Sequence, residues 1–170
     1  LLLCQMIRAR GGEVIGTVST DAKADAAVAA GAHHIIRYDQ EDVAQIVREI
    51  TSHKGVQVVY DGVGRDTFGA SLHSLAPRGT MALFGQSSGP VESFDPQILN
   101  QLGSLFLTRP SLTHFTQTPE ELRWRAFEVF EALEKEVLSF SLHGTYPLED
   151  AHKAHADLAA RLTSGKLLLL

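Results

Sequence analysis

The sequence predicts an α/β fold, a doubly wound parallel sheet with helices on both faces. Short apolar runs alternate with segments of helical period from Leu1 to Pro110, which is the order that such a sheet requires. The runs are nearly all apolar rather than alternating with polar residues, as in strands that are covered on both faces. The 170 residues, 44% of them hydrophobic, allow one domain with a sizeable core.

Each element in this half of the chain has a local signal. Helices are predicted over residues 1–10, 21–30, 42–50 and 67–75. Strands are predicted over residues 14–18, 34–36, 56–60, 80–84 and 103–110. The alanine-rich second helix closes at Gly31, and the third repeats valine and isoleucine at i, i+3, i+4 and i+7 on one face. The last strand stops at a proline, which is typical of a sheet edge.

A long helix is predicted to begin at Thr118. Thr118 can cap the free amides, Pro119 suits the first helical position, and Glu121 completes a capping box. The buried stripe of this helix is expected to hold Leu122, Ala126, Val129, Phe130, Leu133 and Val137. A helix over 148–162 and a buried apolar strand over 167–170 follow.

Residues 1–18 read as a buried helix, a glycine stop at Gly11-Gly12 and a buried strand. This is the second half of a β-α-β unit of the Rossmann-type, dinucleotide-binding fold. Its opening strand and Gly-rich phosphate turn are expected just upstream of Leu1. Because that strand is central in the order 3-2-1-4-5-6, the sheet is expected to be incomplete at its first strand.

Composition argues against several classes of protein. The net charge of −5 argues against an obligatory nucleic-acid partner, since phosphate binding depends on a basic surface. No apolar run approaches the ~20 residues of a membrane span, so no membrane partner is expected. The single cysteine, Cys4, excludes an intrachain disulfide and a Cys-rich zinc site, and it fits a reducing, cytoplasmic setting.

The end of the strand at 14–18 faces the adenosine ribose in a dinucleotide fold. An acidic residue there favours NAD, whereas this chain has Ser19 and Thr20, followed by Lys23 one turn into the next helix. Hydroxyls and a lysine suit a 2′-phosphate, which points to NADP. In the alternative interpretation, Ser19 and Thr20 only cap the helix and Lys23 is a solvated charge. Asp21 complicates the assignment, because one residue earlier it would favour NAD.

Several segments recur in an order and spacing that resemble a known family. They are Gly16–Lys23, Ala29–Ala32, Tyr60–Gly64, Phe84–Gly89, Thr108–Pro110, Tyr146–His152 and Ala154-His155. Together they resemble the NADPH-dependent quinone oxidoreductases, the zeta-crystallin-like branch of the zinc-free medium-chain dehydrogenase/reductase superfamily. The resemblance covers essentially the whole chain. It implies a truncated NADP-binding Rossmann domain at 1–136 and, at 137–170, a segment that packs on a GroES-like catalytic domain absent from this sequence.

The resemblance also implies which residues contact the cofactor, NADPH. Ser19, Lys23 and Tyr38 would contact its 2′-phosphate side. The nicotinamide half would be lined by Gly62, Val63, Phe84, Gly85 and Ser87. Arg161 matches an arginine near the cofactor phosphates, and Arg109 matches a strand-end position. Many relatives carry a serine where this chain has Gly62, so that hydroxyl is missing here.

The implied function is hydride transfer from NADPH to a small-molecule, quinone-like acceptor. The cofactor carries the chemistry and a quinone accepts reducing equivalents readily, so no catalytic residue is assigned within this chain. The alternatives are an enoyl-thioester reductase of the same superfamily and a non-catalytic, NADPH-binding structural protein of the crystallin kind. A homodimer through the edge strand at 103–109 is also expected.

Two other kinds of site carry little weight. His152 and His155 have ligand-compatible helical spacing, but no cysteine or carboxylate cluster accompanies them, so no metal is expected. The segment Gly85–Gly89 matches the literal pattern of a hydrolase nucleophile turn, but Pro90 and the polar stretch after it do not begin a helix. We therefore expect neither a metal site nor a hydrolase.

Overall fold

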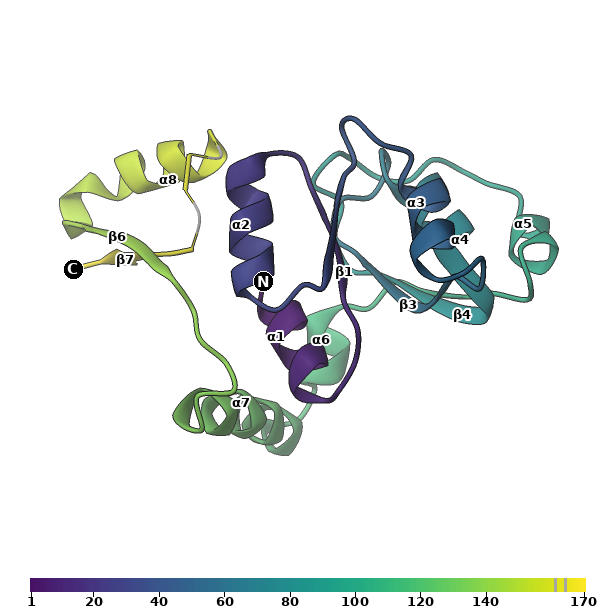
Figure 1. The fold of residues 1–170 in the computed structure, drawn as a ribbon. Coiled ribbons are helices and arrows are strands. Elements are labelled where there is room, and N and C mark those ends of the chain that lie inside the picture. Colours follow the sequence, from purple (N-terminus) through teal and green to yellow (C-terminus); the bar gives the residue numbers. More distant parts are fainter. Residues whose placement is uncertain (161, 164) are drawn as a thin grey trace.

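The computed structural model describes residues 1–160, 162–163 and 165–170, and it confirms the α/β class (Figure 1). The helices are α1 (Leu2–Ala9), α2 (Asp21–Ala29), α3 (Val43–Ile50), α4 (Phe68–Ser74), α5 (Gln97–Gln101), α6 (Leu112–Phe115), α7 (Pro119–Glu134) and α8 (Ala151–Ala159), with a 3-10 turn at Leu148–Asp150. The strands are β1 (Ile15–Val18), β2 (His34–Arg37), β3 (Val56–Asp61), β4 (Leu75–Leu83), β5 (Phe106–Thr108), β6 (Leu142–Tyr146) and β7 (Lys166–Leu169). All the strand pairs are parallel.

The strands form three separate sheets, with the orders β1-β2, β3-β4-β5 and β6-β7. Among the described residues, no backbone hydrogen bond joins the β1-β2 pair to the three strands β3, β4 and β5. The side chains of Val58 and Tyr60 on β3 are 45% and 49% exposed, which is unusual for a parallel strand. The division agrees with the prediction of an incomplete parallel sheet.

Caps explain where the helices begin. Thr20 caps α2 by accepting a hydrogen bond from the third backbone amide of the helix at 3.3 Å, and Asp42 caps α3 in the same way at 3.0 Å. At the start of α7, the Thr118 hydroxyl accepts from the Glu121 amide, and the Glu121 carboxylate accepts from the Thr118 amide. The predicted capping box is therefore confirmed.

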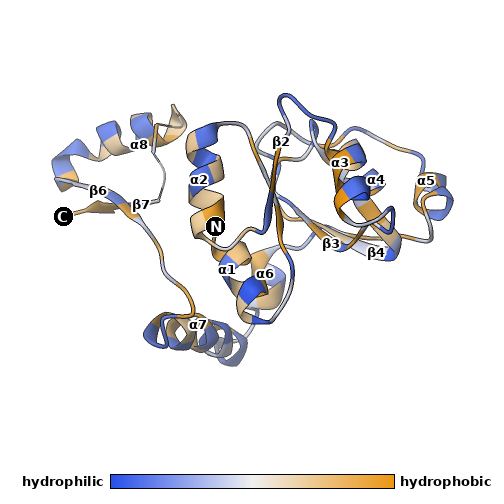
Figure 2. Cartoon of the chain, viewed as in Figure 1, coloured by the Kyte–Doolittle hydropathy of each residue, from blue (hydrophilic) through white to orange (hydrophobic). Residues whose placement is uncertain are grey.

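Most of the core lies between α4 and the three-stranded sheet. Phe68 and Leu72 of α4 pack with Leu75, Met81 and Leu83 of β4. A second, smaller cluster of buried residues contains Val14, Val18, Ala27 and Ala32. Figure 2 shows hydrophobic residues concentrated along β3 and β4 and on the neighbouring helices. Val18 and Leu83, the last residues of β1 and β4, belong to these clusters, so core packing holds these strand ends in place.

Helix α3 links the two parts of the parallel sheet, because it follows β2 and packs against α4. The Arg48 guanidinium on α3 donates to the carbonyl oxygens of His73 at 3.0 Å and Leu75 at 2.9 Å. It also donates to the carbonyl oxygen of His53 at 3.3 Å. One side chain of α3 therefore ties this helix to the junction between α4 and β4.

Three predictions of burial are wrong. No residue of α1 is buried, and the terminal strand β7 exposes Leu168 and Leu169. No residue of α7 is buried either, and the exposed residues of its predicted stripe are Leu122, Val129, Phe130 and Val137. The reason is that, in the part of the chain that the structure describes, no helix or strand packs closely against α7, and β7 pairs with β6 alone.

Some boundaries also differ from the predicted ones. Strand β4 begins at Leu75 rather than Thr80, because Leu75 already pairs with Val56 before a shift in register. The predicted strand at 103–110 is reduced to the three residues of β5, and the predicted helix at 148–162 is a 3-10 turn followed by α8. Strand β6 was not predicted. No described helix is long and apolar enough to cross a membrane.

Candidate functional site

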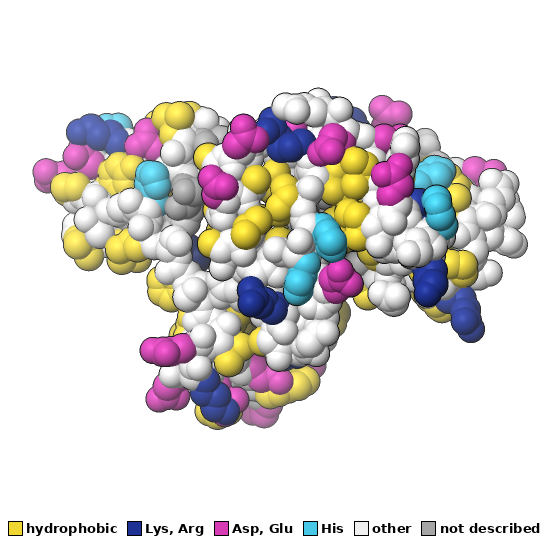
Figure 3. Space-filling model, viewed as in Figure 1, with side chains coloured by type: hydrophobic (Ala, Val, Ile, Leu, Met, Phe, Trp, Pro, Cys, Tyr) yellow, Lys and Arg dark blue, Asp and Glu magenta, His cyan; other side chains and the backbone are white. Residues whose placement is uncertain are grey.

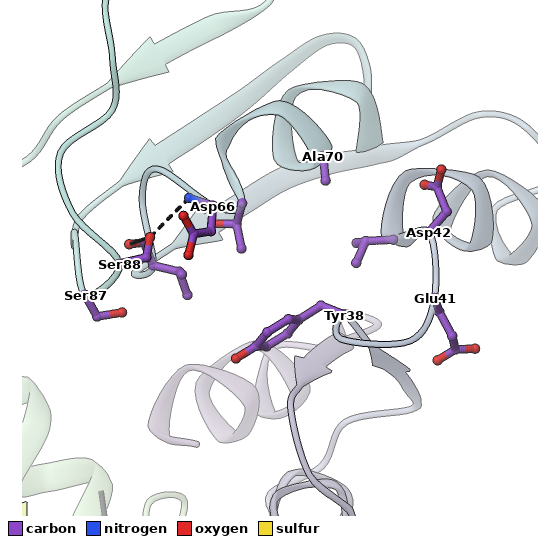
Figure 4. Close-up of a pocket in the computed structure, with 10 residues that line it drawn as sticks. Tyr38, Glu41, Asp42, Asp66, Ala70, Ser87 and Ser88 are labelled. Carbon is purple, nitrogen blue, oxygen red and sulfur yellow. Dashed lines mark hydrogen bonds between the residues drawn. The ribbon is translucent and has the colours of Figure 1, made fainter. Parts of the chain in front are cut away.

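A pocket of about 560 Å³ opens at the carboxyl ends of β2, β3 and β4 (Figure 4). Its lining includes Tyr38, Val63, Thr67, Ala70, Ser87 and Ser88. In Figure 4 the Tyr38 ring extends from the loop after β2 toward the side of the pocket formed by Ser87 and Ser88. Ligands of open α/β sheets bind beyond the carboxyl ends of the strands, so the pocket lies where a ligand is expected.

The pocket wall carries three carboxylates, and among the described residues that line it there is no lysine or arginine. Each carboxylate already has a partner. Glu41 Oε2 accepts from the backbone amide of Arg37 at 2.7 Å, Asp42 caps α3, and Asp66 Oδ1 accepts from the side chain of Arg65 at 3.0 Å. A phosphate is therefore disfavoured inside the pocket, whereas a flat, uncharged ring fits beside Tyr38.

Asp61, the last residue of β3, organises the loop that follows this strand. One carboxylate oxygen accepts from the backbone amides of Val63 at 2.8 Å and Gly64 at 3.0 Å. The hydroxyls of Thr67 and Ser71 donate to the same carboxylate at 2.8 Å and 2.7 Å. Asp61 is only 4% exposed, so these contacts replace the water that a buried carboxylate needs.

The loop after β4 is fastened to the loop after β3. The Ser88 hydroxyl donates to the Val63 carbonyl at 2.8 Å and accepts from the Asp66 amide at 3.1 Å, as the dashed line in Figure 4 marks. The backbones also touch closely: a Cβ added to Gly85 would stand 2.3 Å from the carbonyl oxygen of Gly62. This approach requires glycine at residue 85.

A second group of polar side chains lies at the end of β1. Lys23 Nζ, in the first turn of α2, is 3.4 Å from the Ser19 hydroxyl oxygen, to which it donates. The Tyr38 amide donates to the Val18 carbonyl at 3.1 Å, so the end of β2 lies beside the end of β1. A hydroxyl, an ammonium group and a phenol therefore belong to neighbouring strand ends, all of them able to donate hydrogen bonds to an anion.

Arg37, the last residue of β2, lies between two carboxylates. Its guanidinium donates to both oxygens of Asp39, each at 2.9 Å, and it also pairs with Asp21, the first residue of α2. The hydrogen bonds to Asp39 raise the pKa of Arg37, and the same bonds lower the pKa of Asp39. The Arg37 side chain is 19% exposed, whereas that of Asp21 is 94% exposed.

The structure brings together most of the predicted site residues. Tyr38, Val63 and Ser87 line the pocket, and the remaining residues of the two loops are Gly62, Phe84 and Gly85. Ser19 and Lys23 lie beside the end of β2, outside the pocket wall. Arg109 follows β5 and is not among the residues that line the pocket. Arg161 lies outside the described residues.

Asp61, Ser88 and Arg37 were not predicted to belong to a site. Asp61 could have been found, since an aspartate followed by a glycine-rich turn often accepts from the amide two residues on. The Ser88 contacts depend on how two loops meet, and the pairing of Arg37 with Asp21 depends on the parallel register of β1 and β2. No sequence pattern indicates either the Ser88 contacts or the pairing of Arg37 with Asp21.

The described residues contain no group of three or more histidine, cysteine, aspartate or glutamate side chains placed to hold a metal ion. His152 and His155, the pair with helical ligand spacing, are both exposed on α8.

Parallel strands joined by helices, with a pocket and glycine-rich loops at their carboxyl ends, define a protein with a Rossmann-like α/β fold. Within that class, residues 1–130 match the family model described as "Zinc-binding dehydrogenase". The chain belongs to this family of dehydrogenases.

Several similar proteins are described as quinone oxidoreductases. Quinone oxidoreductase 1 of Escherichia coli (strain K12) is 45% identical over 172 residues, which cover 100% of this chain and 53% of that protein. A solved mycobacterial quinone oxidoreductase superposes with a TM-score of 0.93 at 53% identity, over 99% of this chain and 52% of that one. The Escherichia coli quinone oxidoreductase solved with NADPH gives 0.92 at 45% identity, over 99% and 52%. The chain thus spans about half the length of the curated relatives it matches.

Proposed function

We propose that this chain is the NADPH-binding part of an NADPH-dependent quinone oxidoreductase. The observation that carries the proposal is the placement of Ser19, Lys23 and Tyr38 at the adjacent ends of β1 and β2. The Ser19 hydroxyl and the Lys23 ammonium group are the donors proposed to bind the 2′-phosphate, with the Tyr38 ring beside them on the same side of the cofactor. Relatives described as quinone oxidoreductases, one of them solved with NADPH, support the same assignment.

The charges of the site fit this cofactor. A phosphate bound by Ser19 and Lys23 lies outside the pocket wall and so avoids its three carboxylates. An uncharged base can enter the pocket and lie against the exposed ring of Tyr38. We therefore propose separate places for the charged and the aromatic parts of the adenosine end.

The two fastened loops are proposed to line the nicotinamide half of the cofactor. Their residues are Gly62, Val63, Phe84, Gly85 and Ser87. Backbone amides and carbonyls at glycine positions let a ligand approach the chain closely. We keep Arg161 as a proposed contact to the cofactor phosphates and Arg109 as a proposed cofactor contact, with Arg161 outside the described residues and Arg109 beyond the pocket wall.

NADPH, when bound, supplies the hydride that is transferred. The residues of this chain bind and orient the cofactor, and none of them is proposed as an acid or base. Asp61 and Ser88 fix the two loops, so the cofactor meets a wall that is already formed. Because the donors at the strand ends are already ordered, little conformational entropy is lost in arranging them when the cofactor binds.

The acceptor is proposed to be a quinone or a related small molecule. We propose that residues 1–136 bind the cofactor and that residues 137–170 pack on a further part of the protein, which supplies most of the acceptor pocket. Exposed apolar residues within 137–170, among them Phe140, Leu142 and Leu168, support such a contact. We also propose a cytoplasmic location and a homodimer formed through β5, which lies at one end of its sheet. Light scattering tests the dimer, and a monomer at high concentration would contradict it.

The function is tested by assaying NADPH oxidation with a quinone, and separately with an enoyl thioester, in the protein that carries this chain. Turnover with the quinone supports the proposal. Turnover with the thioester alone supports an enoyl reductase, and tight NADPH binding with no turnover supports a structural protein.

The cofactor assignment is tested by the variant Lys23→Ala. We expect the Kd for NADPH to rise about 30-fold while the Kd for NADH changes less than about threefold, because one charged contact to phosphate contributes about 2 kcal/mol. Lys54→Ala, which removes an exposed lysine outside the site, is the matched control. An equal loss for NADPH and NADH in Lys23→Ala would contradict the 2′-phosphate assignment.

A further inference from the structure

Asp21 poses a problem for any phosphate at the end of β1. It lies two residues after Ser19 and two before Lys23, in the first turn of α2. Its side chain is 94% exposed, so its charge is presented to whatever binds there. Asp39, which follows Tyr38, adds a second carboxylate on the β2 side. Without a compensating positive charge, these two carboxylates would oppose the attraction between Lys23 and a phosphate.

Arg37 forms ion pairs with both carboxylates. Its guanidinium holds Asp39 by two parallel hydrogen bonds of 2.9 Å and pairs with Asp21 across the two strands. Figure 3 shows basic and acidic side chains side by side over the top of α2 and the loop after β2. With Arg37 in place, Lys23 and Arg37 balance Asp21 and Asp39. Without it the same group carries one net negative charge.

We propose that Arg37 is a specificity-determining residue, which neutralises Asp21 and Asp39 and thereby lets the site accept a 2′-phosphorylated adenosine in preference to an unphosphorylated one. This inference rests on the proposed function. The arginine acts through its two carboxylates rather than by touching the phosphate, so Lys23 and Ser19 remain the direct contacts. Asp21 begins α2 just after β1, whereas Arg37 ends β2. Their pairing, and hence this neutralisation, therefore depends on the register of β1 with β2.

The test compares binding of adenosine 2′,5′-bisphosphate with binding of adenosine 5′-monophosphate, measured by calorimetry in the protein that carries this chain. The readout is the ratio of the two dissociation constants, which needs no turnover. In Arg37→Gln we expect the preference for the 2′-phosphate to fall about tenfold, as for one unit charge several ångströms from a phosphate at a protein surface. Arg37→Lys keeps the charge and should retain the preference within about threefold.

The double variant Arg37→Gln with Asp21→Asn separates this role from a merely structural one. It has the same local net charge as the parent protein, so the preference should return to within about threefold of the original value. Arg123→Gln, which removes an exposed arginine of α7 that pairs with the exposed Glu120, is the matched control. The thermal unfolding midpoint of every variant shows whether it is folded.

Three results would overturn the inference. An unchanged preference in Arg37→Gln would show that the neutralisation is irrelevant. Loss of preference that Asp21→Asn does not restore would mean that Arg37 binds the phosphate itself or only supports the fold. A parent protein with no preference for the 2′-phosphate would refute the proposed function and this inference together, and that result is recognisable before any variant is made.

Discussion

Replacing Asp61 with alanine should disrupt the loop that forms one side of the pocket. The carboxylate accepts from two backbone amides, of Val63 and Gly64, and from the hydroxyls of Thr67 and Ser71. Alanine removes every acceptor at once. The Gly64 amide is buried, so it loses its partner without gaining water.

The cost can be worked from these four contacts. A hydrogen bond to a charged acceptor contributes about 1.5–3 kcal/mol, so four independent bonds would give about 6–12 kcal/mol. The bonds share one carboxylate, and water can reach the half-buried residues Val63, Thr67 and Ser71 once the loop loosens. We therefore expect Asp61→Ala to lower the free energy of unfolding by about 3–4 kcal/mol. Asp61→Asn keeps one oxygen for the amides and should cost about 1–2 kcal/mol.

The assay is urea unfolding followed by far-ultraviolet circular dichroism, because the single tryptophan, Trp124, lies on α7 outside this loop. Asp66→Ala is the matched control, since Asp66 belongs to the same loop but is exposed and pairs only with Arg65 through its side chain. It should cost less than about 1 kcal/mol. If Asp61→Ala cost less than about 1 kcal/mol, or no more than Asp66→Ala, the reasoning would be refuted.

Two further predictions concern the glycines and the arginine cluster. Gly85→Ala should lower the free energy of unfolding by about 2–3 kcal/mol, because its Cβ would meet the Gly62 carbonyl oxygen at 2.3 Å. In Gly69→Ala, on α4, the new Cβ meets nothing within 4 Å, so the free energy of unfolding should rise by about 0.5–1 kcal/mol. Thermal melts compare the two variants, and equal effects would contradict the prediction. The hydrogen bonds from Arg37 lower the pKa of Asp39. The stability that this ion pair contributes is therefore fully present above the ordinary aspartate pKa, and it is lost as the pH falls through the lowered pKa of Asp39. The Asp39→Asn variant should lack this acid-induced loss of stability. Identical acid-unfolding profiles for the variant and the parent would contradict the prediction.

The alternation of strands and helices was predictable because each element carries its own signal. The starts of α2, α3 and α7 coincide with Thr20, Asp42 and Thr118, whose side chains make the capping bonds. These contacts span three or four residues, so they depend on local sequence alone. For the same reason the pocket could be expected near the glycine-rich segments after β3 and β4.

Burial was less predictable, for a different reason. The apolar stripe of α7 shows which face would be covered, but not which surface covers it. In the described structure Phe130 and Leu122 of that stripe are 67% and 55% exposed. A periodic pattern records the chemistry of one face, whereas burial also needs a partner surface. The same holds for the leucines at the start of α1 and along β7.

The charge cluster was beyond sequence reasoning for a third reason. Arg37 and Asp39 are close in sequence, but Asp21 reaches Arg37 only because β1 and β2 pair in parallel, with Val18 opposite Arg37. A shift of one residue in that register would turn Arg37 to the other face of the sheet. Hence the charge pairing that is proposed to affect the cofactor preference depends on a strand pairing that spans two elements.

The candidate site is divided between parts of the fold that share no sheet hydrogen bonds. The charged donors belong to β1, β2 and α2, whereas the two fastened loops belong to β3 and β4. Their separation must therefore be set by side-chain packing and by the loops rather than by a continuous ladder of strands. Arg48 is one contact that does so, since it reaches from α3 to the carbonyls of His73, near the end of α4, and Leu75, at the start of β4. The pocket between Tyr38 and Ser87 thus depends on how α3 packs against α4, well below the strand ends where the ligand is proposed to bind.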